Sequence, residues 1–167
     1  MISPQELKMI YTYELVEVEP LRSLKEMNLV SGEVSGCTPL SIVKIPYFVA
    51  LALKDSNFLQ IRLPFYLSPE YLKKKLEEEM SNKDEYSYLQ DSLFAIGKEI
   101  VRNSYNAEDA QAICSLIDQL KEIRFKKTLN GLEKLDGSTL NLNNLTMFEY
   151  NEVKKCMVES MGLIKKV

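Results

Sequence analysis

The stretch from Asn106 to Leu135 most constrains the fold, because its apolar spacing predicts one helix of about 25 residues, or about 38 Å at 1.5 Å per residue. Asn106 and Asp109 stand three residues apart, a pattern that predicts a helix start capped by Asn106. One apolar face recurs at intervals of three and four residues and comprises Ile113, Leu116, Ile117, Leu120 and Ile123. A second face, rotated from the first, comprises Phe125, Leu129, Leu132 and Leu135. Because two apolar faces need more than one neighbour, we expect this helix to be the central element.

A second helix start is marked by Thr146 and Glu149, whose types and spacing match a capping box. In this motif the threonine oxygen accepts a hydrogen bond from the backbone amide of residue 149, and the glutamate reaches back to the threonine amide. Leu145 and Tyr150 occupy the positions of a hydrophobic staple on either side of the cap. The buried face of this helix is predicted to comprise Tyr150, Val153, Met157 and Met161.

The rest of the chain divides into a small unit with strands and a larger unit of helices. Extended runs are predicted at residues 15–19, 27–30, 42–45 and 58–63. Gly32 to Gly36 is predicted to be a turn-rich segment. Further helices are predicted at residues 4–13, 47–54, 69–80 and 86–103. The sequence therefore predicts an α+β fold, mainly α, with a small β-containing domain at residues 1–63 and a helical-bundle domain at residues 64–167.

The composition excludes several classes of function. The chain contains no histidine, so neither a Ser-His-Asp triad nor a histidine metal site can be built. No Gly-Lys-Ser/Thr sequence follows Gly32 or Gly36, which excludes a phosphate-binding loop. We therefore expect no enzyme activity, no cofactor and no metal. The carboxylates Glu77, Glu78 and Glu79 are interpreted as a solvated helix face.

Charge and cysteine content indicate the surroundings of the protein. A net charge of −3 argues against non-specific nucleic-acid binding as the main activity. Cys37, Cys114 and Cys156 are odd in number and far apart, which favours neither a disulfide framework nor a zinc site. Cys114 and Cys156 are expected to be small core residues. With no signal peptide and no apolar stretch of ~18 residues, we expect a protein of a reducing, intracellular compartment.

The basic residues of the long helix leave two interpretations open. Lys126 is expected on a solvated face, whereas Arg124 and Lys127 lie close to the buried face. An arginine there needs a carboxylate of another helix or another subunit, because an unpaired buried charge is strongly destabilising. The alternative is a stand-alone helical adaptor or DNA-binding module, whose site would be the basic cluster Lys121, Arg124, Lys126 and Lys127.

Several segments, taken in order, resemble one known family. In the N-terminal unit they are Glu14-Leu15-Val16, the Gly32 to Gly36 turn, Pro39, Val43 to Pro46 running into Ala50 to Lys54, and Arg62-Leu63-Pro64. In the helical unit they are Arg124 with Lys127, and Asn144-Leu145-Thr146 followed by Glu149 and Asn151. Over nearly the whole chain, these segments resemble the Psf-two family of subunits of the GINS complex.

The resemblance implies a non-enzymatic scaffold subunit in the nucleus, required for DNA replication initiation and fork progression. Its implied partners are the other three GINS subunits, joined through their helical domains, and, within the CMG helicase, the MCM ring and a third protein. Contact with DNA would be indirect or weak, and no membrane is involved. An archaeal relative with the same domain order is also considered. The residues expected at a subunit interface are Leu120, Arg124, Lys127, Leu145, Thr146, Glu149 and Tyr150.

Overall fold

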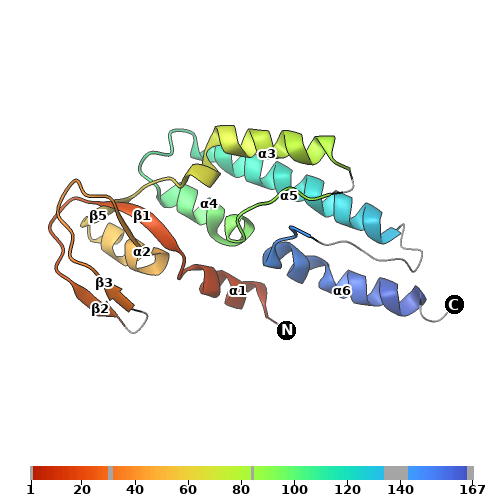
Figure 1. Cartoon of the computed structure of the whole chain (residues 1–167), viewed down its shortest axis with the longest axis horizontal. Helices are drawn as coiled ribbons and strands as arrows, with labels where there is room; N and C mark the ends of the chain where they lie inside the picture. The colour runs from red at the N-terminus through yellow and green to blue at the C-terminus, as the bar shows by residue number, and fades with distance from the viewer. Residues whose placement is uncertain (1, 30–31, 84, 134–142, 165–167) are drawn as a thin grey trace.

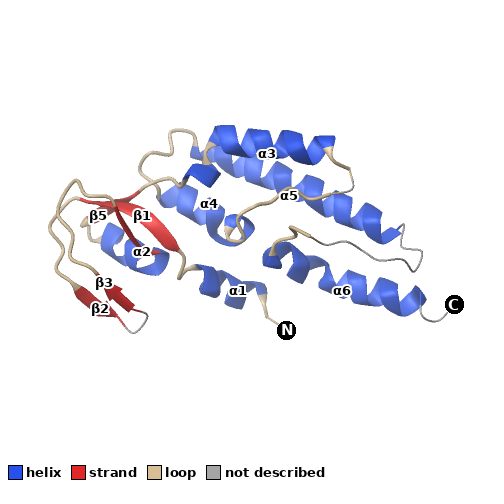
Figure 2. Ribbon diagram, in the orientation of Figure 1, coloured by secondary structure: helices blue, strands red, loops and turns tan. Residues whose placement is uncertain are grey.

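The strands gather at one end of the molecule and the helices extend away from them (Figures 1 and 2), in a computed structural model that describes residues 2–29, 32–83, 85–133 and 143–164. The first part contains α1 (Pro4–Tyr11), β1 (Leu15–Pro20), β2 (Met27–Leu29), β3 (Gly32–Val34), β4 (Val43–Pro46), α2 (Tyr47–Asp55) and β5 (Leu59–Ile61). The second part contains the short 3-10 helix η1 (Phe65–Leu67), α3 (Pro69–Ser81), α4 (Leu93–Asn103), α5 (Ala110–Glu133) and α6 (Met147–Ile164). The α+β, mainly α, fold class is confirmed.

The central sheet has the strand order β4-β1-β5 and is antiparallel throughout. Val16 lies opposite Ile45 and Val18 lies opposite Ile61, and all four side chains are buried. Glu17, between the two valines, is exposed. This alternation places one face of the sheet in the core, as the period of two in the sequence predicts.

The predicted turn-rich segment is wrong in one respect, because it contains strand β3. Strands β2 and β3 form a separate antiparallel ribbon in which Met27 lies opposite Val34. A bridge between Leu24 and Cys37 extends the pairing. Gly36 lies so close to the facing chain that an added Cβ would be 3.3 Å from the carbonyl oxygen of Leu24. A three-residue strand beside glycine is too short to show a clear alternation, which explains why the sequence suggested only a turn.

One cluster of buried side chains runs through both parts of the molecule. It joins sheet residues such as Val18 and Ile61 to helical residues such as Ile100 and Ile117. Helix α1 contacts α4 and α6 of the helical part, and Lys8 of α1 forms an ion pair with Glu99 of α4 at 2.5 Å. The predicted division between residues 63 and 64 stays a prediction, and the core is continuous across it.

Two helices begin later than expected, because tertiary contacts occupy the predicted starts. Residues 86–92 precede α4 in a non-helical conformation, and α4 begins at Leu93 rather than at residue 86. Asn106 does not cap α5, because its side-chain oxygen accepts a hydrogen bond from the backbone amide of Leu63 at 2.7 Å instead. Asp109 takes the capping role and accepts the backbone amide of Ala112 at 3.3 Å. Helix α1 ends at Tyr11, two residues before the expected end.

Helix α5 is the central helix, as predicted, and contacts α3, α4 and α6. Its fully buried face comprises Ile113, Ile117, Leu120, Arg124, Thr128 and Leu132. The second apolar face is wrong in part, because Phe125 is 42% exposed. The predicted member Leu135 lies outside the described residues. The face that the neighbouring helices cover is therefore continuous, and an arginine stands in the middle of it.

The prediction that Cys114 and Cys156 are core residues is wrong for Cys156, which is exposed. Cys114 is half-buried and packs against the main core, and Cys37 is buried. All three are free thiols. Cys156 stands one position before the buried residue Met157, so the apolar spacing of α6 points to that neighbour instead.

Candidate functional site: a buried charge cluster

Arg124 is completely buried on the inward face of α5. Its guanidinium forms a two-bond fork with Glu149, with Nε 2.6 Å from Oε1 and Nη2 3.0 Å from Oε2. Nη1 also donates to Glu79 Oε1 at 2.5 Å. The backbone carbonyls of Ser87 and Asn144 accept the other two bonds, at 3.0 and 2.7 Å. These five bonds use the full donor capacity of a guanidinium.

Glu79 on α3 supplies the second carboxylate, and its side chain is also completely buried. Its Oε1 accepts hydrogen bonds from the backbone amide and the hydroxyl of Ser87, both at 2.8 Å, and from Arg124. Its Oε2 accepts Lys127 Nζ. Burial alone would raise the pKa of Glu79, but the hydrogen bonds from Lys127 and Ser87 and the charge of Arg124 outweigh it, so the pKa is lowered. These neighbours therefore keep Glu79 ionised.

Glu149 joins this site to the first turn of α6. Its backbone amide donates to Thr146 Oγ1 at 3.3 Å, and its Oε2 accepts the backbone amide of Thr146 at 2.9 Å. The predicted capping box is confirmed. The same Oε2 accepts Nη2 of Arg124. One carboxylate thus caps α6 and attaches it to α5. We call Glu79, Arg124, Lys127 and Glu149 the charge cluster; its two positive and two negative charges cancel.

The loop before α4 closes the charge cluster on one side. The ring of Tyr86 has its centroid 5.0 Å from Arg124 Cζ and 5.4 Å from Lys127 Nζ, within the range of a cation–π contact. The Tyr86 hydroxyl and Thr128 Oγ1 are 2.9 Å apart. Burial is the main cause that raises the pKa of Tyr86. The ring therefore shields the two cations from water and does not itself carry charge at neutral pH.

The arrangement of the charge cluster is suited to holding helices together. Each charged group in it is bonded to an opposite charge or a backbone group, so no carboxylate is left free to act as an acid or base. Within the described ranges, no three histidine, cysteine or acidic side chains come together as metal ligands. In the same ranges, no helix combines the length and apolar character of a membrane span.

The structure brings the seven predicted interface residues together around the contact between α5 and α6. Arg124, Lys127 and Glu149 belong to the charge cluster, and Thr146 provides the cap of α6. Leu120 is fully buried in the main core. Leu145 and Tyr150 are half-buried and pack against a smaller cluster of Leu132, Val153 and Met157. Their expected role at a subunit interface stays a prediction, and within this chain they organise the start of α6.

The basic cluster proposed for the alternative function is neutralised within the chain. Lys121 pairs with Glu152 at 2.7 Å, and Lys126 pairs with Glu122 at 2.6 Å. Arg124 and Lys127 are engaged in the charge cluster. Lys126 lies on a solvated face, as predicted, with its side chain 68% exposed. These four residues therefore supply no surplus positive charge for a DNA backbone.

Glu79 is the functional residue that the sequence reading missed. It was interpreted with Glu77 and Glu78 as part of a solvated helix face, but Glu79 is 2% exposed, whereas the next residue, Met80, is 55% exposed. The signal was its spacing, because Glu79 follows Leu72 by seven residues and Leu76 by three, which puts it on their face of α3. A buried arginine predicted from α5 requires a carboxylate on a neighbouring helix, and Glu79 fulfils that requirement.

Acid should remove the stabilising effect of Glu79. Its pKa is lower in the folded protein than the ordinary value of 4.5, so its contribution is complete above that value and is lost as the pH falls through the lower folded pKa. We expect the difference in unfolding free energy between wild type and Glu79→Gln to be largest near neutral pH and to shrink as the pH falls below the ordinary value of 4.5. Urea unfolding of both proteins at a series of pH values measures this difference in free energy. Glu77→Gln, which retains Glu79, should follow the wild-type profile; a difference that does not depend on pH would contradict the prediction.

Two family models match this chain in tandem. The PSF2 N-terminal domain matches residues 3–62, and the GINS complex protein helical bundle domain matches residues 66–167. The second match alone covers more than half of the chain. The chain belongs to the PSF2 family of GINS complex proteins. Members of this family are subunits of a DNA replication complex. The resemblance seen in the sequence is confirmed.

Relatives match this chain over almost its whole length. A probable DNA replication complex GINS protein PSF2 of Encephalitozoon cuniculi is 40% identical over 166 residues, which are 99% of this chain and 95% of the relative. The DNA replication complex GINS protein PSF2 of Debaryomyces hansenii is 27% identical over 99% of this chain and 82% of the relative. That of Schizosaccharomyces pombe is 25% identical over 99% of this chain and 90% of the relative. The matched segments therefore span both the strand-containing part and the helical part of this chain.

Proposed function

We propose that this chain is a non-catalytic structural subunit of the GINS heterotetramer, and that it supports replication initiation and fork progression within the CMG helicase in the nucleus. The observation that carries the proposal is the 40% identity to a probable GINS protein PSF2 over 99% of this chain and 95% of the relative. Its partners are then the other GINS subunits and, through them, the MCM ring and the third CMG component. A scaffold needs rigid helices, and the charge cluster ties α3, α5 and α6 together.

The seven predicted interface residues contribute to this function in two ways. Leu145 and Tyr150 are half-buried at the start of α6 and remain available to a neighbouring subunit. Leu120, Arg124, Lys127, Thr146 and Glu149 act through the fold, because they fix where α6 lies. We propose that loss of the second group weakens assembly by displacing α6.

The apolar surface expected for an obligate subunit is better placed on α1 than on α5. The faces of α5 are largely covered by α3, α4 and α6 of the same chain. Met9 and Ile10 of α1, together with Ile2 just before it and Tyr13 just after it, have exposed side chains and line a hollow of about 610 Å³. An exposed apolar patch of this kind favours a protein–protein contact. We propose that a GINS subunit covers it.

Co-expression tests the proposal. We expect the chain made alone to bind an apolar-surface dye and to aggregate on size exclusion, because α1 and the start of α6 lack their cover. The same chain made with the other GINS subunits should elute as a single complex and bind little dye. Met9→Ser with Ile10→Ser should reduce dye binding of the isolated chain, whereas Lys73→Ser, an exposed change on α3, should not. An isolated wild-type chain that is monomeric and binds no dye would contradict the scaffold proposal.

A further inference from the structure

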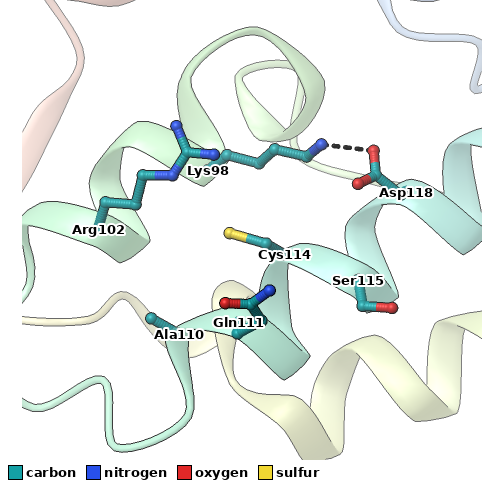
Figure 3. A pocket seen from close by; sticks show the side chains of 7 residues that line it. All are labelled: Lys98, Arg102, Ala110, Gln111, Cys114, Ser115 and Asp118. Carbon is teal, nitrogen blue, oxygen red and sulfur yellow. Dashed lines mark hydrogen bonds and ion pairs between the residues drawn. The ribbon is translucent and has the colours of Figure 1, made fainter.

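A second surface, which shares no residue with the charge cluster, carries charged and polar side chains. A hollow of about 500 Å³ lies between α4 and the first turns of α5. Lys98 and Arg102 of α4 line one side, and Gln111, Cys114 and Asp118 of α5 line the other (Figure 3). The sulfur of Cys114 points toward the side chains from α4. The hollow is open to solvent and has no aromatic side chain in its lining.

The charges around this hollow do not balance. Lys98 forms an ion pair with Asp118, so these two charges cancel. Arg102 is exposed, and among the described residues it has no hydrogen-bond or ion-pair partner. Arg102 also lines a neighbouring hollow of about 240 Å³, which it shares with Lys54. Lys54 Nζ donates at 2.7 Å to the neutral side-chain oxygen of Asn103. Two cations without a paired carboxylate therefore stand side by side at the junction between the sheet and α4.

We propose that this hollow docks an acidic segment of another protein chain, with a carboxylate on Arg102. A guanidinium with five free donors matches a carboxylate through two parallel hydrogen bonds. The side-chain amide of Gln111, which has no partner within the described residues, is placed to bind the backbone of the same segment. The bond between Lys98 and Asp118 leaves Arg102 as the cation that the segment meets first.

A nucleic-acid strand fits the hollow less well than an acidic peptide does. A strand needs a row of cations matched to successive phosphates, and single-stranded binding also uses aromatic side chains on which bases stack. Here one lining cation is cancelled by Asp118, and no aromatic residue lines the hollow. This docking role goes beyond the proposed scaffold function and does not depend on which complex contains the chain.

Cys114 provides a reporter for this site. The probe is a short synthetic peptide of alternating glutamate and serine, and its matched control has glutamine in place of glutamate. The full chain is treated with iodoacetamide in the presence of each peptide, and mass spectrometry follows each cysteine separately. Cys156 is exposed on α6, far along the chain from the hollow, and serves as the internal control.

The glutamate peptide should slow modification of Cys114 about threefold at about twice its Kd, and should leave Cys156 unaffected. The glutamine peptide should protect neither cysteine. Arg102→Gln should abolish the protection, while Lys73→Gln, which removes an exposed cation of α3, should retain it. Circular dichroism should show that both variants stay folded, since both side chains are exposed.

Three results would overturn the proposal. These are a lack of protection in the wild type, equal protection in Arg102→Gln, and equal protection by a short single-stranded oligonucleotide. None of them bears on whether the chain assembles with GINS subunits, so the two proposals fail separately.

Discussion

Arg124→Leu should lower the free energy of unfolding by about 3–5 kcal/mol, because it leaves two buried carboxylates with one cation between them. The leucine retains an apolar stem but removes all five hydrogen bonds of the guanidinium. Glu79 keeps its bonds to Lys127 and Ser87, whereas Glu149 keeps only its bonds to Thr146. Helix α6 should therefore separate from α5 before the main core unfolds.

Urea unfolding measured by circular dichroism tests this prediction, with co-purification of GINS subunits as a second readout. Arg124→Lys keeps the charge but cannot form the two-bond fork with Glu149, so it should lie between leucine and wild type in both measurements. Lys126→Leu is the matched control, since it removes an exposed cation two residues away and should change stability by less than about 0.5 kcal/mol. If Arg124→Leu proved as harmless as Lys126→Leu, the charge cluster would have no structural role.

Glu79→Ala should be nearly as destabilising as the loss of Arg124, with an expected cost of about 3–5 kcal/mol at neutral pH. The substitution leaves Arg124 and Lys127 together in a buried site with Glu149 as the remaining carboxylate. It also deprives the amide and hydroxyl of Ser87 of their acceptor, which loosens the loop before α4.

Glu77→Ala provides a sharp control, because Glu77 is exposed on the same helix only two residues earlier. Alanine has the higher helix propensity, so this variant should be as stable as wild type or slightly more stable. Thermal unfolding of both variants distinguishes a buried from a solvated carboxylate. Equal melting temperatures for Glu77→Ala and Glu79→Ala would restore the solvated reading of residue 79.

The sequence predicted the helices best where local signals and packing agree. The capping box at Thr146 and the predicted helix start at residue 69 are both correct, because their capping hydrogen bonds are made within a few residues. The predicted start at residue 86 is wrong, because Tyr86 and Ser87 bond to α5 and α3 rather than to a helical turn of their own. Local spacing cannot report a hydrogen bond to a distant element.

The sequence predicted the buried cation of the charge cluster but not its carboxylate partner on α3. Arg124 stood out, because an arginine beside a run of isoleucine and leucine on one helix face requires a partner. Its partner on α3 did not stand out, because three consecutive glutamates after a run of lysines are typical of a solvated helix face, and only the spacing from Leu72 and Leu76 distinguishes Glu79 from the other two. The choice among Glu77, Glu78 and Glu79 depends on how α3 rotates against α5, and that rotation is set by packing of the apolar residues Leu72 and Leu76.

Glu149 both caps α6 and bonds Arg124 of α5, so the stability of α6 depends on α5 being in place. The first turn of a helix is unfavourable in an isolated chain, because several residues are ordered for few hydrogen bonds. Here the carboxylate that completes the first turn of α6 is oriented by Arg124 on α5. We therefore expect the first turn of α6 to be stabilised further once α3 and α5 have packed around Arg124. During synthesis, we expect the α6 segment to remain unfolded until α3 and α5 have packed together. An incompletely folded chain would then not expose a folded α6 to other proteins.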